Sequence, residues 1–176
     1  EALDALYVAI LTDTGSFRFS NSTPLAHRLV ADLIAEGVDP EVLHRQVYGR
    51  SPMRRFRILQ AALDTLEAEQ GVGWMTIPPG LYDELGAQPG DLDGLVDYPR
   101  SVEGVHVALL FRATSKGTKI SFRSDGLVDV NALAREFGGG GHVRASGALV
   151  EGPLDEVRPR VVESARRAVA TARNEG

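Results

Sequence analysis

The chain has 176 residues, of which 43% are hydrophobic and 24% charged, and its formal net charge is −5. This composition is typical of a soluble globular protein of one domain, or of one domain with part of another. No apolar run approaches the ~20 residues that a membrane helix needs, and no segment resembles a signal peptide, so we expect a cytoplasmic protein with no membrane partner. Since the chain has no cysteine, disulfides and thiolate metal sites are excluded, and a metal would have to bind Asp, Glu or His.

The charge is distributed unevenly, because residues 61–100 carry −7 and residues 101–150 carry +2. Duplex DNA binding needs many basic residues on one face, so we expect no duplex DNA partner, whereas a small anionic ligand fits the 101–150 segment. The acidic residues of the first segment do not have the spacing of a calcium loop, and we expect them to form a solvated edge. They include Asp83, Glu84, Asp91, Asp93 and Asp97.

The first 70 residues predict helices only. Apolar side chains recur at helical spacing, and Thr23 followed by Pro24 is a typical N-cap and first helical position. The chain begins at Glu1 without an initiator Met and inside an apolar periodic segment, so we expect it to be a piece of a longer protein. The helices are expected over residues 3–11, 24–37, 40–48 and 52–70.

The periodicity changes after Gly71, where short apolar runs bounded by turn residues predict strands, and Ser115-Lys116-Gly117 predicts a hairpin. Strands are expected over residues 72–77, 105–111, 118–123 and 148–150, and helices over 128–137 and 154–173. The expected fold class is α/β: the helical end of one domain over residues 1–50, a linker helix over 51–70 and a mixed-sheet domain over 71–176.

Asp13 is the first candidate for chemistry, because it lies in the turn Thr12-Asp13-Thr14-Gly15 after the first helix. A carboxylate held by a tight turn is rigid, as a metal ligand or a general base needs to be. On this spacing alone, an Asp that hydrogen-bonds its own backbone is the commoner explanation. Whether Asp13 is a functional residue therefore has to be judged from other motifs in the chain.

A run of four glycines is the second candidate. Glycine lets the backbone approach a ligand closely and turn its N–H groups toward phosphate oxygens, and a following His and Arg add charged donors. An Arg and a Ser at the end of a predicted strand could face the same pocket. A plain helix C-cap is the alternative, although ordering four glycines has a large entropic cost. The candidate anion-binding residues are Arg123, Ser124, Gly138, Gly139, Gly140, Gly141, His142 and Arg144.

Together these motifs resemble a known superfamily. The sequence TDTGSF at residues 12–17, the sequence NSTP at 21–24 and the later run GGGGHVRASG are similar to motifs of DHH phosphoesterases with their DHH-associated C-terminal domain. The resemblance is strongest to the nanoRNase branch, which contains oligoribonucleases, phosphatases of 3′-phosphoadenosine 5′-phosphate and cyclic-dinucleotide phosphodiesterases. It covers nearly the whole chain.

The resemblance implies a hydrolase in which His and Asp residues of four motifs bind two Mn ions that activate a water for attack on phosphorus. Asp13 matches the last of these motifs, which implies a metal-binding and catalytic role. Arg123 and the Gly-rich loop with His142 match the superfamily's contacts to substrate phosphate and nucleotide. The implied partners are short RNA or nucleotide substrates, and the sequence leaves a homo-oligomer open.

The other metal-binding motifs, including Asp-His-His itself, are missing from these residues, and we expect them upstream of Glu1. The chain alone is therefore expected to be inactive or nearly so while it retains a substrate-binding domain. The alternative is an RNA-binding module without catalysis, because similar Gly-rich domains end alanyl-tRNA synthetases. Asp13 and its helix favour the enzyme. A folded fragment with no retained function is the third hypothesis.

Overall fold

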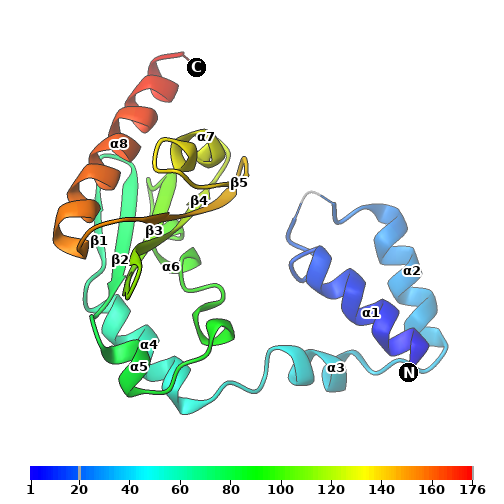
Figure 1. Ribbon diagram of the computed structural model, residues 1–176. Coiled ribbons are helices and arrows are strands. Elements are labelled where there is room, and N and C mark those ends of the chain that lie inside the picture. Colours follow the sequence, from blue (N-terminus) through cyan, green and yellow to red (C-terminus); the bar gives the residue numbers. More distant parts are fainter. Residues whose placement is uncertain (20, 176) are drawn as a thin grey trace. The chain divides into compact units, whose positions relative to one another are not determined.

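The computed structural model of the protein describes residues 1–19 and 21–175, and it divides into two units at Ser51 and Pro52 (Figure 1). The first unit contains α1 (Ala2–Asp13), α2 (Pro24–Ala35) and α3 (Pro40–Val47), and these elements confirm the prediction of helices for residues 1–50. The hydroxyl of Thr23 accepts the N–H of Ala26 at 3.3 Å and so caps α2 as predicted. The buried core of this unit is small and consists of Tyr7, Leu11, Val30, Leu33, Val38 and Leu43.

The second unit is built on a six-stranded sheet with the order β1-β2-β3-β4-β6-β5. Only β2 and β3 are parallel, and the other neighbouring strands are antiparallel. The expected mixed α/β fold is therefore confirmed. The strands are β1 (Glu67–Glu69), β2 (Val72–Ile77), β3 (Val107–Thr114), β4 (Gly117–Ser124), β5 (Gly140–His142) and β6 (Ala145–Val150). The helices are α4 (Met53–Leu63), α5 (Leu81–Glu84), the 3-10 helix η1 (Pro89–Leu92), α6 (Asp97–Arg100), α7 (Val130–Arg135) and α8 (Leu154–Glu175).

Helix α4 is shorter than the sequence predicted. The hydroxyl of Thr65 donates to the carbonyl of Thr76 at 3.1 Å and accepts the N–H of Thr76 at 2.8 Å, which turns the chain back toward β2. Residues 67–69 then pair with β2 as a strand, so the prediction of a helix to residue 70 is wrong at its C-terminal end. Ile58 and Ala62 of α4 are fully buried in the second unit, and α4 is therefore part of that unit rather than a separate linker.

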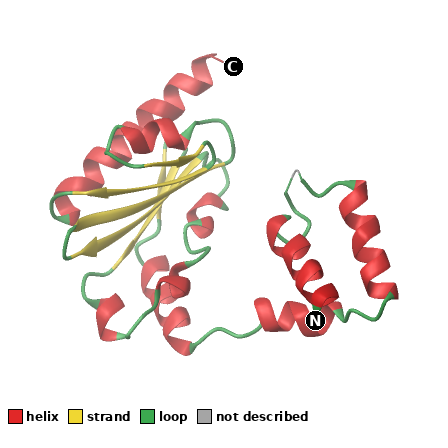
Figure 2. Ribbon diagram, turned by 45° about the vertical axis from the view of Figure 1, so that its right-hand side comes forward, coloured by secondary structure: helices red, strands yellow, loops and turns green. Residues whose placement is uncertain are grey.

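Helices α7 and α8 cover one face of the sheet (Figures 1 and 2). Because side chains alternate along a strand, every second residue of β3 and β4 enters this core, and Phe111, Ile120 and Phe122 are fully buried there. Burying a large apolar side chain of this kind contributes roughly 1.5–3 kcal/mol relative to leaving it exposed. This face therefore holds the larger of the two apolar cores of the second unit. No helix in residues 1–19 and 21–175 is both long and apolar enough to cross a bilayer.

The opposite face is covered mainly over β2 and β3, by α4 and by the segment between β2 and β3. Met75, Ile77 and Leu110 are buried under this cover. Over β4, β6 and β5 the same face retains solvent exposure, and we call this uncovered region the open face. Its residues are Lys119, Ser121, Arg123, Gly140, His142, Ala145, Gly147 and Leu149.

Candidate functional site

Two of the predicted binding residues, Arg123 and His142, lie on the open face. Arg123 of β4 lies opposite Ala145 of β6, and His142 of β5 lies opposite the same Ala145. Residues directly opposite in an antiparallel ladder share a face, so Arg123 and His142 lie two strands apart, which is roughly 10 Å at the usual strand spacing. Arg123 is half-buried and His142 is exposed. The ladder therefore presents two donors for an anion on one surface.

Small residues form the sheet surface beside these donors. Gly140 lies opposite Gly147, and Gly147 lies opposite Ser121. A Cβ atom at Gly140 would have only the Oδ1 of Asn131 nearby, at 3.7 Å, so the space above this row is open. Glycines within strands commonly mark a place where a ligand approaches the backbone closely. The row gives a ligand access to the sheet backbone next to Arg123 and His142.

The remaining glycines of the run build the β5–β6 hairpin. A Cβ atom at Gly139 would lie 2.2 Å from the carbonyl oxygen of Gly147, so only glycine lets these two segments approach. The N–H groups of Gly138 and Gly139 donate to helix carbonyls of α7, and the N–H of Gly141 donates to Oδ1 of Asn131 at 2.9 Å. The expectation that the run turns its N–H groups toward phosphate is therefore wrong for these three residues, because the protein itself uses them.

Ser124 and Arg144 lie away from the open face. Strand alternation turns Ser124 toward the face that α7 and α8 cover, where it is buried, and its hydroxyl accepts the N–H of Gly126 at 2.9 Å. The N–H of Ser124 donates to the carbonyl of Arg144 at 3.1 Å. The guanidinium of Arg144 lies against Gly126 in the turn after β4. Both residues thus order the turn after β4 and join it to the β5–β6 turn, which follows His142.

A cavity of about 180 Å³ extends the open face toward the covered strands. Three cationic side chains, Arg112, Lys119 and Arg123, line it together with Ser121 and a single carboxylate residue, Asp93. Arg112 and Lys119 lie directly opposite each other in the β3–β4 ladder. The same two side chains also line a wider depression of about 570 Å³ that reaches Gly139 and Gly147. The open face and the cavity therefore form one continuous basic surface.

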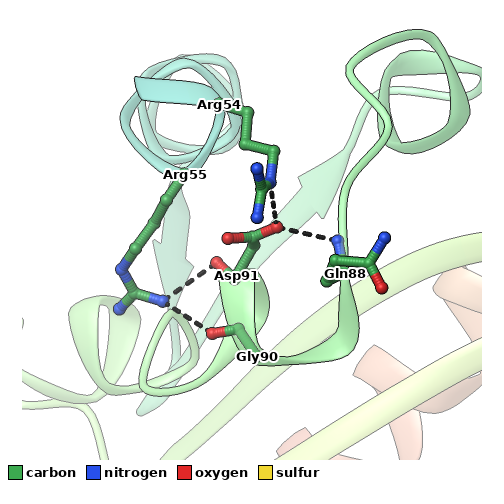
Figure 3. A network of polar contacts seen from close by, with 5 residues as sticks. All are labelled: Arg54, Arg55, Gln88, Gly90 and Asp91. Atoms are coloured by element: carbon green, nitrogen blue, oxygen red, sulfur yellow. Dashed lines mark hydrogen bonds and ion pairs between the residues drawn. The ribbon is translucent and has the colours of Figure 1, made fainter. Parts of the chain in front are cut away.

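A network of polar contacts fixes one wall of this cavity (Figure 3). Asp91 of η1 is only 4% exposed, and its Oδ2 accepts the Nε–H of Arg54 at 2.6 Å and the N–H of Gln88 at 2.7 Å. These hydrogen bonds, that from Arg54 first, hold the pKa of Asp91 below its ordinary value although burial opposes them. Asp91 is therefore an ionised residue inside the structure, and the prediction that it belongs to a solvated acidic edge is wrong.

Arg55 completes the same network from the next position of α4 (Figure 3). Its guanidinium donates to the carbonyls of Gly90, Asp91 and Asp93 at 3.2, 2.9 and 2.6 Å. These carbonyls belong to the segment that forms the cavity wall. Helix α4 thus positions the wall with two consecutive arginines, a role that the helical periodicity of the sequence could not indicate.

Asp13 lies in the first unit, at the exposed C-terminal end of α1. The Nδ2 of Asn21 donates to its Oδ2 at 2.9 Å and to its carbonyl at 3.1 Å. The buried Thr14 hydroxyl donates to the carbonyl of Ile10 at 2.7 Å and accepts the N–H of Phe17 at 3.1 Å. Asn21 therefore orients the carboxylate, and Asp13 is the last residue of α1 rather than part of the turn that the sequence predicted.

The backbone after Asp13 is strained. Gly15, Ser16 and Phe17 have φ angles of 56°, 58° and 64°, and this left-handed region is unfavourable for side chains larger than that of glycine. Such strain persists only where the surrounding structure imposes it, and it is concentrated at functional sites. The turn is thus a good candidate for a functional element.

The residues of this chain do not form a metal centre by themselves. Within residues 1–19 and 21–175, no three His, Asp or Glu side chains lie close enough together to hold an ion. Asp13 offers a single carboxylate, whereas a two-metal site needs several ligands around each ion. No reaction step through a metal can be derived from these residues alone.

Sequence reasoning missed several residues of this surface. Arg112 and Lys119 are separated by the hairpin turn, and the signal that could have paired them is the two-residue turn at Ser115-Lys116, which fixes the register. Asn21 belongs to the NSTP motif, but its contact with Asp13 depends on the strained turn between them. Nothing in the sequence distinguishes the buried Asp91 from its exposed acidic neighbours.

Comparison with known proteins identifies the family. The model of the DHHA1 domain matches residues 74–171, and the chain belongs to this family. The chain is 36% identical over 173 residues to the bifunctional oligoribonuclease and PAP phosphatase NrnA of Thermus thermophilus, covering 98% of this chain and 52% of that protein. It is 27% identical over 154 residues to the protein of the same name from Bacillus subtilis, covering 85% of this chain and 48% of that protein.

A solved structure agrees with this assignment. The exopolyphosphatase-related protein from Bacteroides fragilis superposes with a TM-score of 0.85 at 26% identity, over 96% of this chain and 49% of that protein. The chain thus spans about half the length of the relatives that it matches. The resemblance to DHH phosphoesterases with an associated C-terminal domain is confirmed at the level of the family.

Proposed function

We propose that this chain is the substrate-binding part of a cytoplasmic, Mn-dependent phosphoesterase. Its substrates are short oligoribonucleotides, dinucleotides or 3′-phosphoadenosine 5′-phosphate. The observation that carries the proposal is the open face, where Arg123 and His142 flank a row of small residues that leaves the backbone accessible. The names of the Thermus thermophilus and Bacillus subtilis relatives support this substrate class.

The open face suits a nucleotide for simple chemical reasons. The planar guanidinium of Arg123 can hold two phosphate oxygens at once. The ring of His142 offers a second donor from β5, two strands away. The ribose and base then lie over Gly140 and Gly147, where there is space above the backbone. Gly138, Gly139, Gly141, Ser124 and Arg144 serve binding indirectly, by holding the hairpin that carries His142.

Asp13 is proposed as one ligand of the metal ions. Its carboxylate is oriented by Asn21, an arrangement typical of metal ligands, whose outer partners fix their geometry. The other ligands would have to come from outside residues 1–19 and 21–175. The bound ions would supply an activated water and neutralise phosphate charge.

The test uses a protein of the relatives' full length that carries this chain. It is incubated with a 5′-phosphorylated adenine dinucleotide and Mn, and the release of AMP is followed chromatographically. We expect turnover by the unchanged protein, loss of most turnover in Asp13→Asn, and a KM about tenfold higher in His142→Ala, since a charge-assisted hydrogen bond contributes about 1.5–3 kcal/mol. Arg160→Met, an exposed change on α8, is the matched control.

Three results would contradict parts of the proposal. Full turnover in Asp13→Asn would exclude Asp13 as a metal ligand. Binding of the dinucleotide without cleavage by the full-length protein would instead favour an RNA-binding module. A dinucleotide that neither binds nor reacts would exclude this substrate class altogether.

A further inference from the structure

His27 has no role in the function proposed above, yet its ring contacts the loop that joins α1 to α2 (Figure 1). We call residues 14–19 and 21–23 the α1–α2 loop. The Nε2 atom of His27 lies 3.1 Å from the hydroxyl oxygen of Ser22. The centre of the same ring lies 5.1 Å from the centre of the Phe17 ring, at an interplanar angle of 31°. One side chain of α2 therefore contacts the loop at two points.

The two contacts flank Asn21, the residue that orients Asp13. Phe17 precedes Asn21 in the loop, and Ser22 follows it directly. The side chain of Asn21 is exposed, so its position depends on the loop backbone rather than on burial in a core. A contact that fixes the backbone at Ser22 therefore also fixes the amide that donates to Asp13.

The α1–α2 loop needs such contacts because its backbone is strained. Ser16 and Phe17 have positive φ angles, which residues other than glycine keep only where their surroundings impose them. Phe17 packs against the small core of the first unit, and the ring of His27 lies against it there. Aromatic rings at this separation attract each other. The contact with His27 therefore opposes the relaxation of Phe17 to a negative φ.

The contact between His27 and Ser22 can form in either protonation state of the ring. A neutral ring accepts the O–H of Ser22 at Nε2, and a ring protonated at Nε2 donates to the hydroxyl oxygen. Both forms hold the same two atoms together. His27 can therefore hold the loop whether or not its ring carries a charge.

We propose that His27 is a positioning residue for Asp13, the proposed metal ligand. The ring of His27 fixes the loop at Ser22, the loop fixes the amide of Asn21, and this amide orients the carboxylate of Asp13. Groups that orient a metal ligand from outside raise the affinity for the metal. This inference rests on the proposed function and adds to it a residue of α2.

The first measurement needs no metal and uses the isotopically labelled 176-residue chain. The side-chain amide protons of Asn21 should exchange slowly with water in NMR spectra, because the amide donates to two oxygens of Asp13. His27→Ala and Ser22→Ala should each speed this exchange and shift the amide signals toward those of a solvated amide.

His44→Ala is the matched control for His27→Ala. The ring of His44 in α3 also lies 5.1 Å from an aromatic ring, that of Tyr48 at the end of the same helix. The two variants thus remove the same residue type and a similar ring contact from the first unit. His44→Ala should leave the Asn21 signals unchanged.

The second measurement follows Mn binding by electron paramagnetic resonance in a protein of the relatives' full length that carries this chain. Loss of an outer partner of a metal ligand typically weakens metal binding about 10–100-fold, so we expect about tenfold from Asn21→Ala and about threefold from His27→Ala, which acts less directly. His27→Gln, whose amide can still hydrogen-bond Ser22, should recover most of the affinity. The KM for the dinucleotide should stay unchanged, since the proposed substrate site lies on the open face.

A double-mutant cycle tests whether the ring acts through Ser22. The variant that combines Ser22→Ala with His27→Ala should bind Mn no more weakly than His27→Ala alone. Ser22→Ala removes only one hydroxyl group, so it keeps the test decisive if His27→Ala destabilises the first unit. Circular dichroism of each variant detects such destabilisation.

The outcomes separate this inference from the function on which it rests. If Asp13→Asn weakens Mn binding but His27→Ala and Ser22→Ala behave like His44→Ala, the positioning role is wrong and the proposed ligand stands. If Asp13→Asn leaves Mn binding unchanged, both are wrong. If His27→Ala weakens Mn binding while the amide signals of Asn21 stay unchanged, the ring acts by another route and the inference is wrong.

Discussion

The two faces of strand β4 carry side chains of different kinds. Ile120 and Phe122 are fully buried under α7 and α8, whereas Lys119 and Arg123, which alternate with them along the strand, remain accessible on the open face. One strand thus contributes stability through one set of side chains and ligand contacts through the other. Because the two sets alternate, a substitution can alter one property without altering the other, and this separation can be tested.

The largest effect on stability is expected from the covered face. Phe122→Ala removes a fully buried ring and leaves a cavity, which costs about 3–5 kcal/mol. Urea denaturation followed by circular dichroism measures this loss. A cost below about 1 kcal/mol would mean that this face is not the main source of stability.

A smaller loss is expected from the glycine run, where two neighbouring positions form a matched pair. Gly139→Ala places a methyl group 2.2 Å from the carbonyl of Gly147 and should cost about 1–3 kcal/mol through displacement of the β5–β6 hairpin. Gly140→Ala meets no atom closer than 3.7 Å and should change stability by less than about 0.5 kcal/mol. Instead, Gly140→Ala should weaken nucleotide binding. Equal destabilisation by the two variants would contradict the separate roles assigned to these glycines.

The wall of the cavity should make stability depend on pH through Asp91. The hydrogen bond from Arg54, and then that from Gln88, lower the pKa of Asp91 in the folded state. Its stabilising contribution is therefore complete above the unfolded pKa of about 3.9 and is lost as the pH falls through the lower folded value. The difference in denaturation midpoint between the unchanged chain and Asp91→Asn should be constant from pH 5 to 7 and decrease below about pH 4. A difference at Asp91 that stays the same down to pH 3 would mean that its carboxylate is not the group that Arg54 stabilises.

The smallest effect on stability is expected from the open face. Arg123→Met removes a half-buried cation that, within residues 1–19 and 21–175, donates a hydrogen bond only to the neighbouring carbonyl of Phe122, at 3.0 Å. Its stability should stay within about 0.5 kcal/mol of the unchanged chain, while its affinity for AMP should fall about tenfold. Calorimetric titration beside the denaturation curve checks both. A large loss of stability with unchanged affinity would reverse the roles of the two faces.

The elements that the sequence predicted well are those with local signals. Thr23 and Pro24 start α2, and the turn at Ser115-Lys116 joins β3 to β4, because capping and turn chemistry act over a few residues. Strand β1 was missed because its formation depends on contacts of Thr65 and residues 67–69 with β2. Such a tertiary contact overrides the helical propensity of the preceding segment.

The residues of the candidate site also differ in whether a local sequence signal indicates them. Arg123 and His142 were predicted from strand alternation and from the glycine run, and the ladder through Ala145 brings them to one face. Arg112 could be paired with Lys119 through the register that the Ser115-Lys116 turn sets, whereas the hydrogen bonds of the glycine run depend on Asn131 of α7 and have no such local signal. Residue types thus identified the chemistry, whereas the pairing of distant segments determined which groups are available to a ligand.

The central claim is that the open face binds the nucleotide, and NMR titration of the isotopically labelled chain tests it most directly. A 5′-phosphorylated adenine dinucleotide should shift the backbone amide signals of residues 117–124 and 140–149. The signals of α8, which packs on the other face, should stay unchanged. Shifts confined to α8 or to α1, α2 and α3, with the signals of β4, β5 and β6 unchanged, would contradict the account.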